Sequence, residues 1–233
     1  MNLELCTDCV EGATMAGKYG FKRIELCSAL SEGGLTPSYG LIQACAEASG
    51  ATEVHAMIRT RGGSFTCRGS EFKVMCEDIE QAARAGASGV VFGILDEDGG
   101  VSQQNSELLK IARRFDLQAT FHRAFDQVSE PMEALQTIID MGFDRLLTSG
   151  LRDKAIQGIE LIRSLQSAFG NRIEIMAGSG VNSENAATLA LTGIDNLHFT
   201  ARKSAGEKVV EGMGAHMVTD EQKIRDILEV LNR

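Results

Sequence analysis

The sequence predicts one domain, residues 1–233, with the TIM-barrel fold, a closed (β/α)8 barrel of the α/β class. The first observation is that eight short apolar segments alternate with segments of helical periodicity along the whole chain. The second is that no linker, low-complexity stretch or change of composition divides it. An open, doubly wound sheet is the alternative, but it ordinarily uses fewer strands, and no G-x-G-x-x-G follows the first predicted strand.

The predicted strands are short runs of apolar residues bounded by turn formers. They cover residues 2–6, 23–27, 53–58, 89–93, 117–122, 144–148, 173–177 and 195–200. Between them, apolar residues spaced i, i+3, i+4, i+7 predict amphipathic helices. The clearest such stripes run through residues 72–79, 108–115, 132–139 and 224–231. Glycines at the expected helix exits are typical of C-caps: Gly20, Gly86, Gly142, Gly170 and Gly193.

Composition excludes several classes of protein. A formal net charge of −9 argues against nucleic-acid binding, because a phosphate backbone requires a basic surface. No apolar run approaches the roughly 20 residues of a membrane span, and no signal peptide precedes the first strand, so we expect no membrane association. Six cysteines without the spacing of a secreted scaffold indicate reduced thiols and a cytoplasmic protein. We also expect a homo-oligomer, either a dimer or a tetramer.

The endings of the first two strands repeat each other. Residues 2–6 read NLELC and residues 23–27 read RIELC. Since successive side chains of a strand point to opposite faces, Glu4 and Cys6 share one face, as do Glu25 and Cys27. Two neighbouring parallel strands then bring two carboxylates and two thiols together. A buried, unpaired carboxylate is costly, so this face predicts a functional site.

The same alternation applied to every strand predicts a polar barrel interior. The side chains assigned to it are Glu4, Glu25, His55, Arg59, His122, Glu174 and His198. Barrel interiors are usually filled by branched aliphatic residues, so this set favours a site. The competing interpretation is a self-satisfied salt-bridge network around Arg59.

Residues that follow strands supply further candidates. His122 at a strand end suits general acid–base work or metal binding, and Arg123 and Asp126 can clamp an anion or orient its imidazole. Arg59 and Arg61, beside a glycine turn, fit an anionic ligand, although Arg59 can instead pair with Glu4 or Glu25. We therefore take Glu4, Glu25, Arg59, His122 and Asp126 as catalytic candidates.

Loops at the carboxyl ends of the strands crown the functional face of a barrel. Gly178, Ser179 and Gly180 follow the seventh strand, where exposed backbone N–H groups can hold phosphate, with Asn182 as the N-cap of the next helix. Structurally, the same glycines can simply form a tight turn. Two longer connections, residues 60–70 and 201–218, are the expected binding loops or lids; the second contains Gly206, Gly212 and Gly214.

Among the cysteines, Cys6 and Cys27 stand out because they end adjacent strands on the same face. Two thiolates suit a soft ion such as Cu(I), in linear or trigonal coordination. The other possibility is that both are buried, unreactive cysteines. Cys45 and Cys76 lie on apolar helical stripes and are interpreted as core residues.

Motifs in order along nearly the whole chain resemble those of the CutC family. They are IELC (24–27), GGLTPS (33–38), MIRTRGG (57–63), GVVFGIL (89–95) with DG (98–99), TFHRAFD (120–126) and LTSG (147–150). The resemblance implies a TIM barrel, a cytoplasmic location and the copper homeostasis role for which the family is named. It also implies Cu(I) ligands at Cys6 and Cys27. Thr60 replaces the usual proline, and residues 199–202 depart from the His-Ser-Ser-like pattern.

Two functions follow from the sequence. In the first, the chain is a copper homeostasis protein that binds Cu(I) through Cys6 and Cys27. In the second, it is a barrel enzyme acting on a small anionic or phosphorylated metabolite held by Arg61, Arg123 and the backbone of Gly178, Ser179 and Gly180. The polar interior favours the second, since carboxylates, Arg59 and His122 are poor ligands for Cu(I).

Overall fold

The computed structural model describes residues 1–207 and 214–232. Eight parallel strands close into a barrel in sequence order, which confirms the predicted fold. Each strand begins and ends within one residue of the predicted bounds. The strands are β1 (Asn2–Thr7), β2 (Arg23–Leu26), β3 (Glu53–Met57), β4 (Gly89–Phe92), β5 (Gln118–Phe121), β6 (Arg145–Thr148), β7 (Glu174–Ala177) and β8 (Asn196–Thr200).

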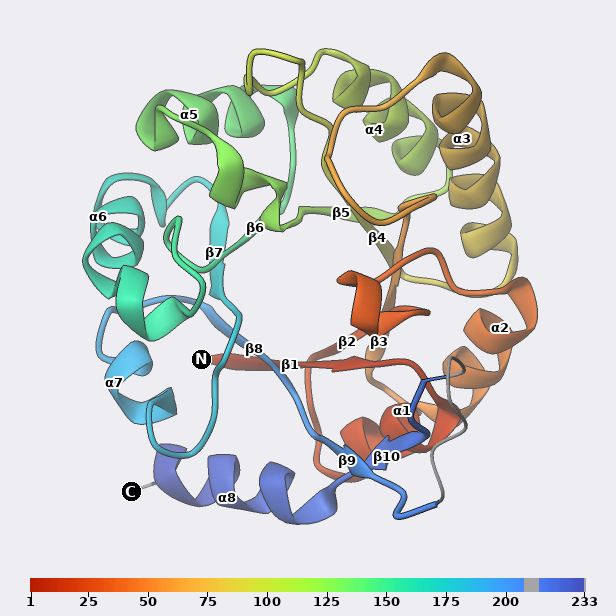
Figure 1. Cartoon of the computed structure of the whole chain (residues 1–233), viewed down its shortest axis with the longest axis vertical. Helices are drawn as coiled ribbons and strands as arrows, with labels where there is room; N and C mark the ends of the chain where they lie inside the picture. Colours follow the sequence, from red (N-terminus) through yellow and green to blue (C-terminus); the bar gives the residue numbers. More distant parts are fainter. Residues whose placement is uncertain (208–213, 233) are drawn as a thin grey trace.

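Helices form an outer ring around these strands (Figure 1). The α-helices are α1 (Val10–Lys18), α2 (Tyr39–Ala48), α3 (Gly69–Arg84), α4 (Gln104–Arg114), α5 (Pro131–Met141), α6 (Ile159–Phe169), α7 (Ala186–Ala190) and α8 (Glu221–Leu231). Three short 3-10 helices lie in the strand-to-helix connections: η1 (Leu30–Glu32), η2 (Arg123–Gln127) and η3 (Ala155–Gly158). None of the described helices has the length and apolar character needed to cross a membrane.

Strand alternation divides the buried side chains into two sets. Leu5, Ile24 and Leu26 belong to the large apolar core between the barrel and its helices. Cys6 and Cys27 belong to a small separate cluster with Met57 and Val91, which Leu30 packs against. This division is the one that the period of two predicts, because residues at even spacing share a face.

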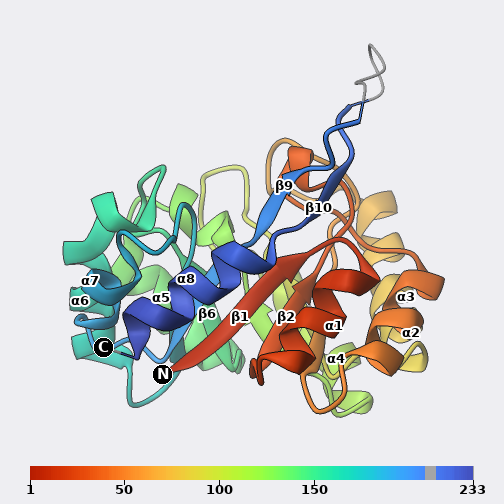
Figure 2. The ribbon, with the colours of Figure 1, turned by 90° about the horizontal axis from the view of Figure 1, so that it is seen from below.

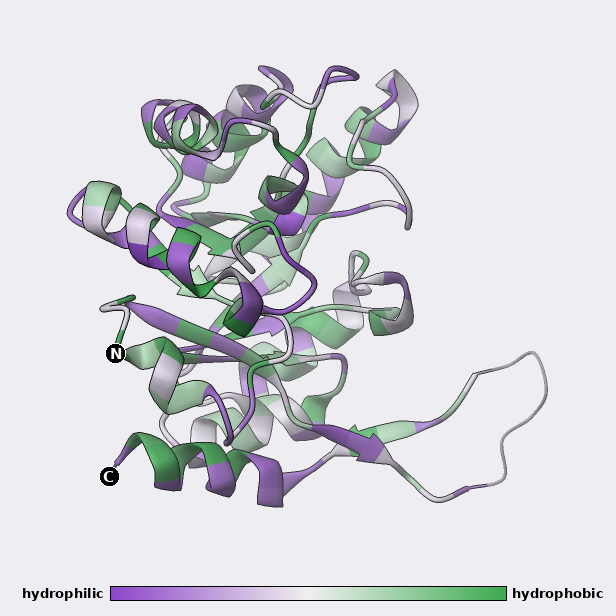
Figure 3. Cartoon of the chain, turned by 60° about the vertical axis from the view of Figure 1, so that its left-hand side comes forward, coloured by the Kyte–Doolittle hydropathy of each residue, from purple (hydrophilic) through white to green (hydrophobic). Residues whose placement is uncertain are grey.

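The predicted helical stripes face the barrel. In α8, Ile224 and Ile227 are buried, and the helix shows alternating hydrophobic and hydrophilic bands (Figure 3). In α5, Pro131 occupies the first turn, and Gly142 ends the helix in the left-handed region at φ +97°. Gly170 departs from the expected glycine cap, because it has right-handed helical angles at the end of α6.

Two local predictions are wrong. Asn182 is not a helix N-cap: α7 begins only at Ala186, and the Asn182 side chain accepts a hydrogen bond from the backbone of Glu184 within a turn. The connection after β8 is not simply a loop, because β9 (Arg202–Ser204) and β10 (Met217–Thr219) pair antiparallel within it. This hairpin extends away from the barrel (Figure 2). Gly212 lies outside the described residues.

The register brings the site residues together. Cys6 is level with Glu25 on β2 and with Thr200 on β8, and Glu4 is level with His198. Side chains from β1, β2 and β8 therefore project into the barrel side by side, although β1 and β8 come from opposite ends of the chain.

Candidate functional site

A cavity of about 580 Å³ opens at the carboxyl ends of the strands. Seven of the predicted site residues line it: Cys6, Glu25, Arg59, His122, Arg123, Ser179 and Gly180. The rest of the polar lining includes His198, Glu32, Gln127 and Thr200, and the apolar part includes Leu30, Met57, Phe65, Leu147 and Phe199. A larger hollow of about 960 Å³ lies between α4 and α5, but its lining contains no predicted site residue. The cavity at the strand ends is therefore the candidate site.

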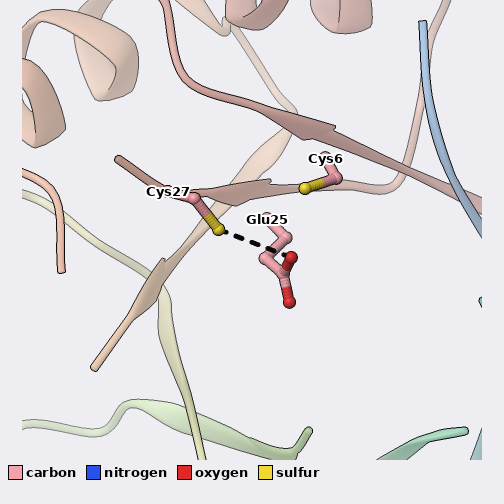
Figure 4. A group of neighbouring side chains, drawn as sticks. All are labelled: Cys6, Glu25 and Cys27. Carbon is pink, nitrogen blue, oxygen red and sulfur yellow. Dashed lines mark hydrogen bonds between the residues drawn. The ribbon is translucent and has the colours of Figure 1, made fainter. Parts of the chain in front are cut away.

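Cys6, Glu25 and Cys27 form a compact triad. One ligand atom from each lies within 4.8 Å of the other two. The Cys27 thiol donates to a carboxylate oxygen of Glu25 across 3.5 Å (Figure 4). Cys27 is fully buried, whereas Cys6 lines the cavity. The triad is thus reached from the cavity through Cys6 and Glu25.

The two thiols of the triad differ in acidity. The hydrogen bond from Cys27 lowers the pKa of Cys6 to about 5, and the nearby His198 acts in the same direction against the effect of burial. The Cys6–Cys27 hydrogen bond and burial raise the pKa of Cys27 well above its ordinary value. Burial and the negative charge on Cys6 likewise raise the pKa of Glu25. The triad therefore combines one acidic thiol, Cys6, with two groups, Cys27 and Glu25, whose pKa values lie above their ordinary range.

Glu25 also belongs to a second triad, with Glu4 and His198. His198 lies 2.8 Å from Glu4 through Nδ1 and 3.7 Å from Glu25 through Nε2. Burial acts to raise the pKa of Glu4, but the hydrogen bond and charge of His198 and the charge of Arg23 lower it to about 2. The charge of Glu25 and the contacts with Cys6 and Glu4 raise the pKa of His198 despite its burial. The remaining oxygen of Glu25, Oε1, is buried and has no hydrogen-bond partner within the part of the chain that the structure describes.

A buried ionic network continues from Glu4. Arg23, which is fully buried, donates from Nε to Glu4 across 3.0 Å and from Nη2 to Asn196. Glu174 lies 3.8 Å from Arg23 and accepts from Arg145 across 2.8 Å. The salt-bridge network considered from the sequence therefore exists, but Arg23 and Arg145 organise it in place of Arg59.

Arg59 makes no ion pair with Glu4 or Glu25. Its guanidinium donates to the carbonyls of Glu32 and Gly63 at 2.9 Å and of Gly34 at 3.3 Å, and it stacks 4.9 Å from the ring centre of Phe65. The reason is positional: β3 ends at Met57, so Arg59 lies beyond the strand and strand alternation does not direct its side chain.

His122 lies directly after β5 and caps η2. Its Nδ1 accepts from the backbone N–H of Ala124 across 3.2 Å. This contact fixes the neutral tautomer, with the proton on Nε2. Burial and the positive charges of Arg59 and Arg123 lower the pKa of His122 to about 3. His122 is therefore neutral, and a base of this strength does not suit proton abstraction near pH 7.

The guanidinium groups expected to hold an anion are paired within the protein instead, and so is the carboxylate of Asp126. Arg61 pairs with Glu71 at 2.6 Å and does not line the cavity. Arg123 pairs with Asp126 at 2.7 Å. Asp126 also accepts from Thr148, from the backbone of Leu151, and from both the hydroxyl and backbone N–H of Ser149. Its position outside the cavity favours a structural role, which is to tie β6 to η2.

The residues of the glycine turn after β7 differ in whether their backbone N–H groups are available to a ligand. The Gly178 N–H donates to the carbonyl of Thr148, so it is not available to a ligand. Ser179 and Gly180 line the cavity with left-handed backbone angles, φ +82° and +68°. In the described part of the chain, neither of their N–H groups has a protein acceptor.

Sequence reasoning missed Arg23 and Arg145. Each stands at the first position of its strand, and each shares a face with an interior residue two positions later, Glu25 and Leu147. The alternation rule contained this signal, because both residues are in phase with interior positions of their strands. His55 is buried as predicted, but it does not line the cavity. Among the described residues neither ring nitrogen has a hydrogen-bond partner, although Nε2 lies 3.7 Å from a carboxylate oxygen of Glu53.

Comparison with known proteins decides the family. The family model described as CutC family matches residues 1–203. The chain belongs to the CutC family. A CutC family protein of Bacteroides fragilis is 41% identical over 240 residues, with 97% of this chain and 95% of the relative covered. A CutC protein of Vibrio vulnificus is 44% identical over 209 residues, with 89% and 83% covered.

A solved CutC structure supports this assignment. The structure from Streptococcus agalactiae, described as that of a candidate copper homeostasis protein, shares 32% identity and a TM-score of 0.77. The match covers 85% of this chain and 98% of that chain. Thiamine phosphate pyrophosphorylase from Pyrococcus furiosus, at 15% identity and a TM-score of 0.64, shares the fold alone.

Proposed function

We propose that this CutC family chain takes part in copper homeostasis by binding Cu(I) through Cys6 and Cys27. The observation that supports the proposal is the triad, in which the two sulfurs and a Glu25 oxygen lie within 4.8 Å of one another. Cu(I) prefers soft sulfur ligands and accepts low coordination numbers, so two cysteines are a sufficient donor set.

The surroundings of the two sulfurs fit a soft cation. Cys6 and Cys27 pack with Met57, whose thioether adds a third soft donor to the same cluster. The thiolate is the form that binds metal, and the low pKa of Cys6 supplies one at neutral pH. Cys27 would lose its proton when the ion binds, because metal binding favours the deprotonated ligand.

Glu25 and His198 would hold the donors in place. Glu25 accepts from Cys27, and His198 lies between Glu25 and Glu4. Groups that contact metal ligands in this way orient them and tune their basicity. The six cysteines are all free, which fits a reducing compartment, and we place the protein in the cytoplasm as part of the proposal.

Competition for Cu(I) against a chelator of known affinity tests the proposal. The Cys6→Ser/Cys27→Ser variant should lose affinity by more than roughly a hundredfold, the upper range for removing a residue that only supports a ligand. The matched control is Cys67→Ser/Cys76→Ser, which also removes two thiols but lies outside the triad. Equal affinity for Cu(I) in the wild type and the triad variant would show that copper does not bind at this site.

A further inference from the structure

The cavity presents a set of hydrogen-bond donors that copper binding does not use. Three of them lie in its lining: Nε2 of His122 and the backbone N–H groups of Ser179 and Gly180. His122 is only 4% exposed, and Nε2 has no protein partner among the described residues. Nε2 is not among the fully enclosed polar atoms that lack a partner, so it is an accessible donor on a side chain that lines the cavity.

A guanidinium group lies near these donors. Arg59 lines the same cavity and forms no ion pair within the part of the chain that the structure describes, since its donors go to backbone carbonyls. Carbonyl oxygens satisfy its hydrogen bonds, and the charge of Glu32 acts on it without forming an ion pair. Arg123, by contrast, is neutralised by Asp126. The lining therefore places a guanidinium without an ion-pair partner beside neutral donors, although Glu32, Glu25 and Cys6 also line the cavity.

We propose that the cavity is a binding site for a small organic anion, with its carboxylate or phosphate-monoester group held by His122, Ser179 and Gly180. Arg59 provides the compensating charge. At about 580 Å³ the cavity has more room than an inorganic anion fills, and Phe65, Leu147 and Phe199 offer apolar contact to an organic body. The proposal does not rest on copper binding, because none of the three donor residues belongs to the sulfur triad.

Neutral N–H donors of this kind suit an anionic ligand. A neutral imidazole with its proton on Nε2 donates to an oxyanion without requiring a proton from solvent. Successive backbone N–H groups in a turn likewise form a concave donor surface for anions. Cys6 and Glu25 line the same cavity, so a bound anion would lie in the space through which the triad is reached.

Calorimetry on the metal-free protein at constant ionic strength tests the proposal. The probes are glycerol 3-phosphate and orthophosphate in one arm and succinate in the other, with sodium chloride and glycerol as references. Saturable binding of glycerol 3-phosphate or succinate, with an accompanying rise in melting temperature, is the expected result. If the phosphate probes bind, the anionic group of the ligand is a phosphate; if succinate binds, it is a carboxylate. No saturable binding in either arm would overturn the proposal.

His122→Asn is the diagnostic variant. The asparagine oxygen can still accept from the Ala124 N–H, as Nδ1 does, but the donor at Nε2 is removed. Affinity should fall by roughly tenfold, the effect of one hydrogen bond to a charged group. Arg59→Gln should also weaken binding, while Arg61→Gln, which removes the same charge outside the cavity, should change it less than twofold. An equal loss of affinity in both arginine variants would show that only the net charge of the protein matters, and would contradict a specific anion site in the cavity.

A measurement on the wild type makes the test independent of how well the variants fold. The ¹H–¹⁵N signal of His122 Nε2 should shift on saturation with the anion that binds. An unchanged signal at saturation would exclude His122 from the site.

Discussion

His198 and Glu4 join the last strand of the barrel to the first through a contact of 2.8 Å between Nδ1 and Oε1. The two residues are level in the register of β8 and β1, and the Glu4 side chain is almost completely buried. Arg23 contacts the other oxygen of Glu4 from β2 at 3.0 Å. One carboxylate thus pairs with a guanidinium and with an imidazole whose pKa it raises, at the seam where the barrel closes, and this pairing makes the polar interior compatible with folding.

Glu4→Gln should be strongly destabilising. The change keeps the shape of the side chain but leaves Arg23 and His198 without their carboxylate, and breaking a buried ion pair costs about 3–5 kcal/mol. Urea unfolding measures the loss. The matched control is Glu160→Gln, which breaks the exposed pair with Arg163 and should stay close to wild type. A Glu4→Gln protein as stable as the control would show that the network carries no net stability.

Much of the barrel interior could be predicted from the sequence. Glu4, Cys6, Glu25 and Cys27 face inward because the strand period of two is a local property that one strand reveals by itself. The fold followed from eight repetitions of the same local pattern. Local reasoning also placed His122 correctly at the end of β5 and found Ser179 and Gly180 after β7.

Pairings across the barrel could not be predicted in this way. Glu4 meets Arg23 and His198 at sequence separations of 19 and 194 residues, and no local pattern encodes which charge meets which. Arg59 was assigned to the interior because it continues the alternation of β3, yet the strand ends two residues earlier. Beyond a strand end, the backbone no longer fixes the direction of a side chain, and nearby carbonyls capture the guanidinium.

His122 should make folding sensitive to acid. Its pKa is lowered from 6.5 to about 3, so the unfolded chain binds a proton at higher pH than the folded one. Its contribution to stability is complete above pH 6.5 and is lost as the pH falls toward 3, by up to about 1.4 kcal/mol per pH unit. Urea unfolding of wild type and His122→Asn between pH 7.5 and 4.5 should therefore give curves that converge on acidification. Parallel curves would mean that His122 is readily protonated in the folded protein.

Cys6 should react as a thiolate well below the pH at which ordinary cysteines do. Its pKa is about 5 and it lines the cavity, whereas burial raises the pKa of Cys67. Iodoacetamide should modify Cys6 at a nearly constant rate from pH 6.5 to 8, while the rate at Cys67 should rise about tenfold per pH unit. Mass spectrometry of timed digests separates the two sites. A rate at Cys6 that also rises tenfold per unit would place its pKa in the ordinary range.

Gly34 should be needed both for its left-handed backbone conformation and for the geometry of the Cys6–Glu25–Cys27 triad. It has φ +92°, and a Cβ added there would lie 3.0 Å from the sulfur of Cys27 and 3.5 Å from the terminal carbon of Met57. Gly34→Ala should cost about 1–2 kcal/mol from the left-handed backbone alone. It should additionally displace the Cys27 sulfur and so weaken Cu(I) binding, measured by chelator competition.

Gly20→Ala separates the backbone effect of Gly34→Ala from its contact with the sulfur. Gly20 has a similar left-handed conformation, φ +66°, but a Cβ added there meets nothing within 4 Å. It should lose stability to a comparable degree from backbone strain while keeping wild-type affinity for Cu(I). If Gly34→Ala also kept full affinity, a shift of the Cys27 sulfur would be irrelevant to copper, and Cys27 would lose its proposed role as a ligand. If both variants weakened binding equally, the effect would belong to general destabilisation of the fold. Only a selective loss at Gly34 supports a metal site whose geometry the glycine turn after β2 protects.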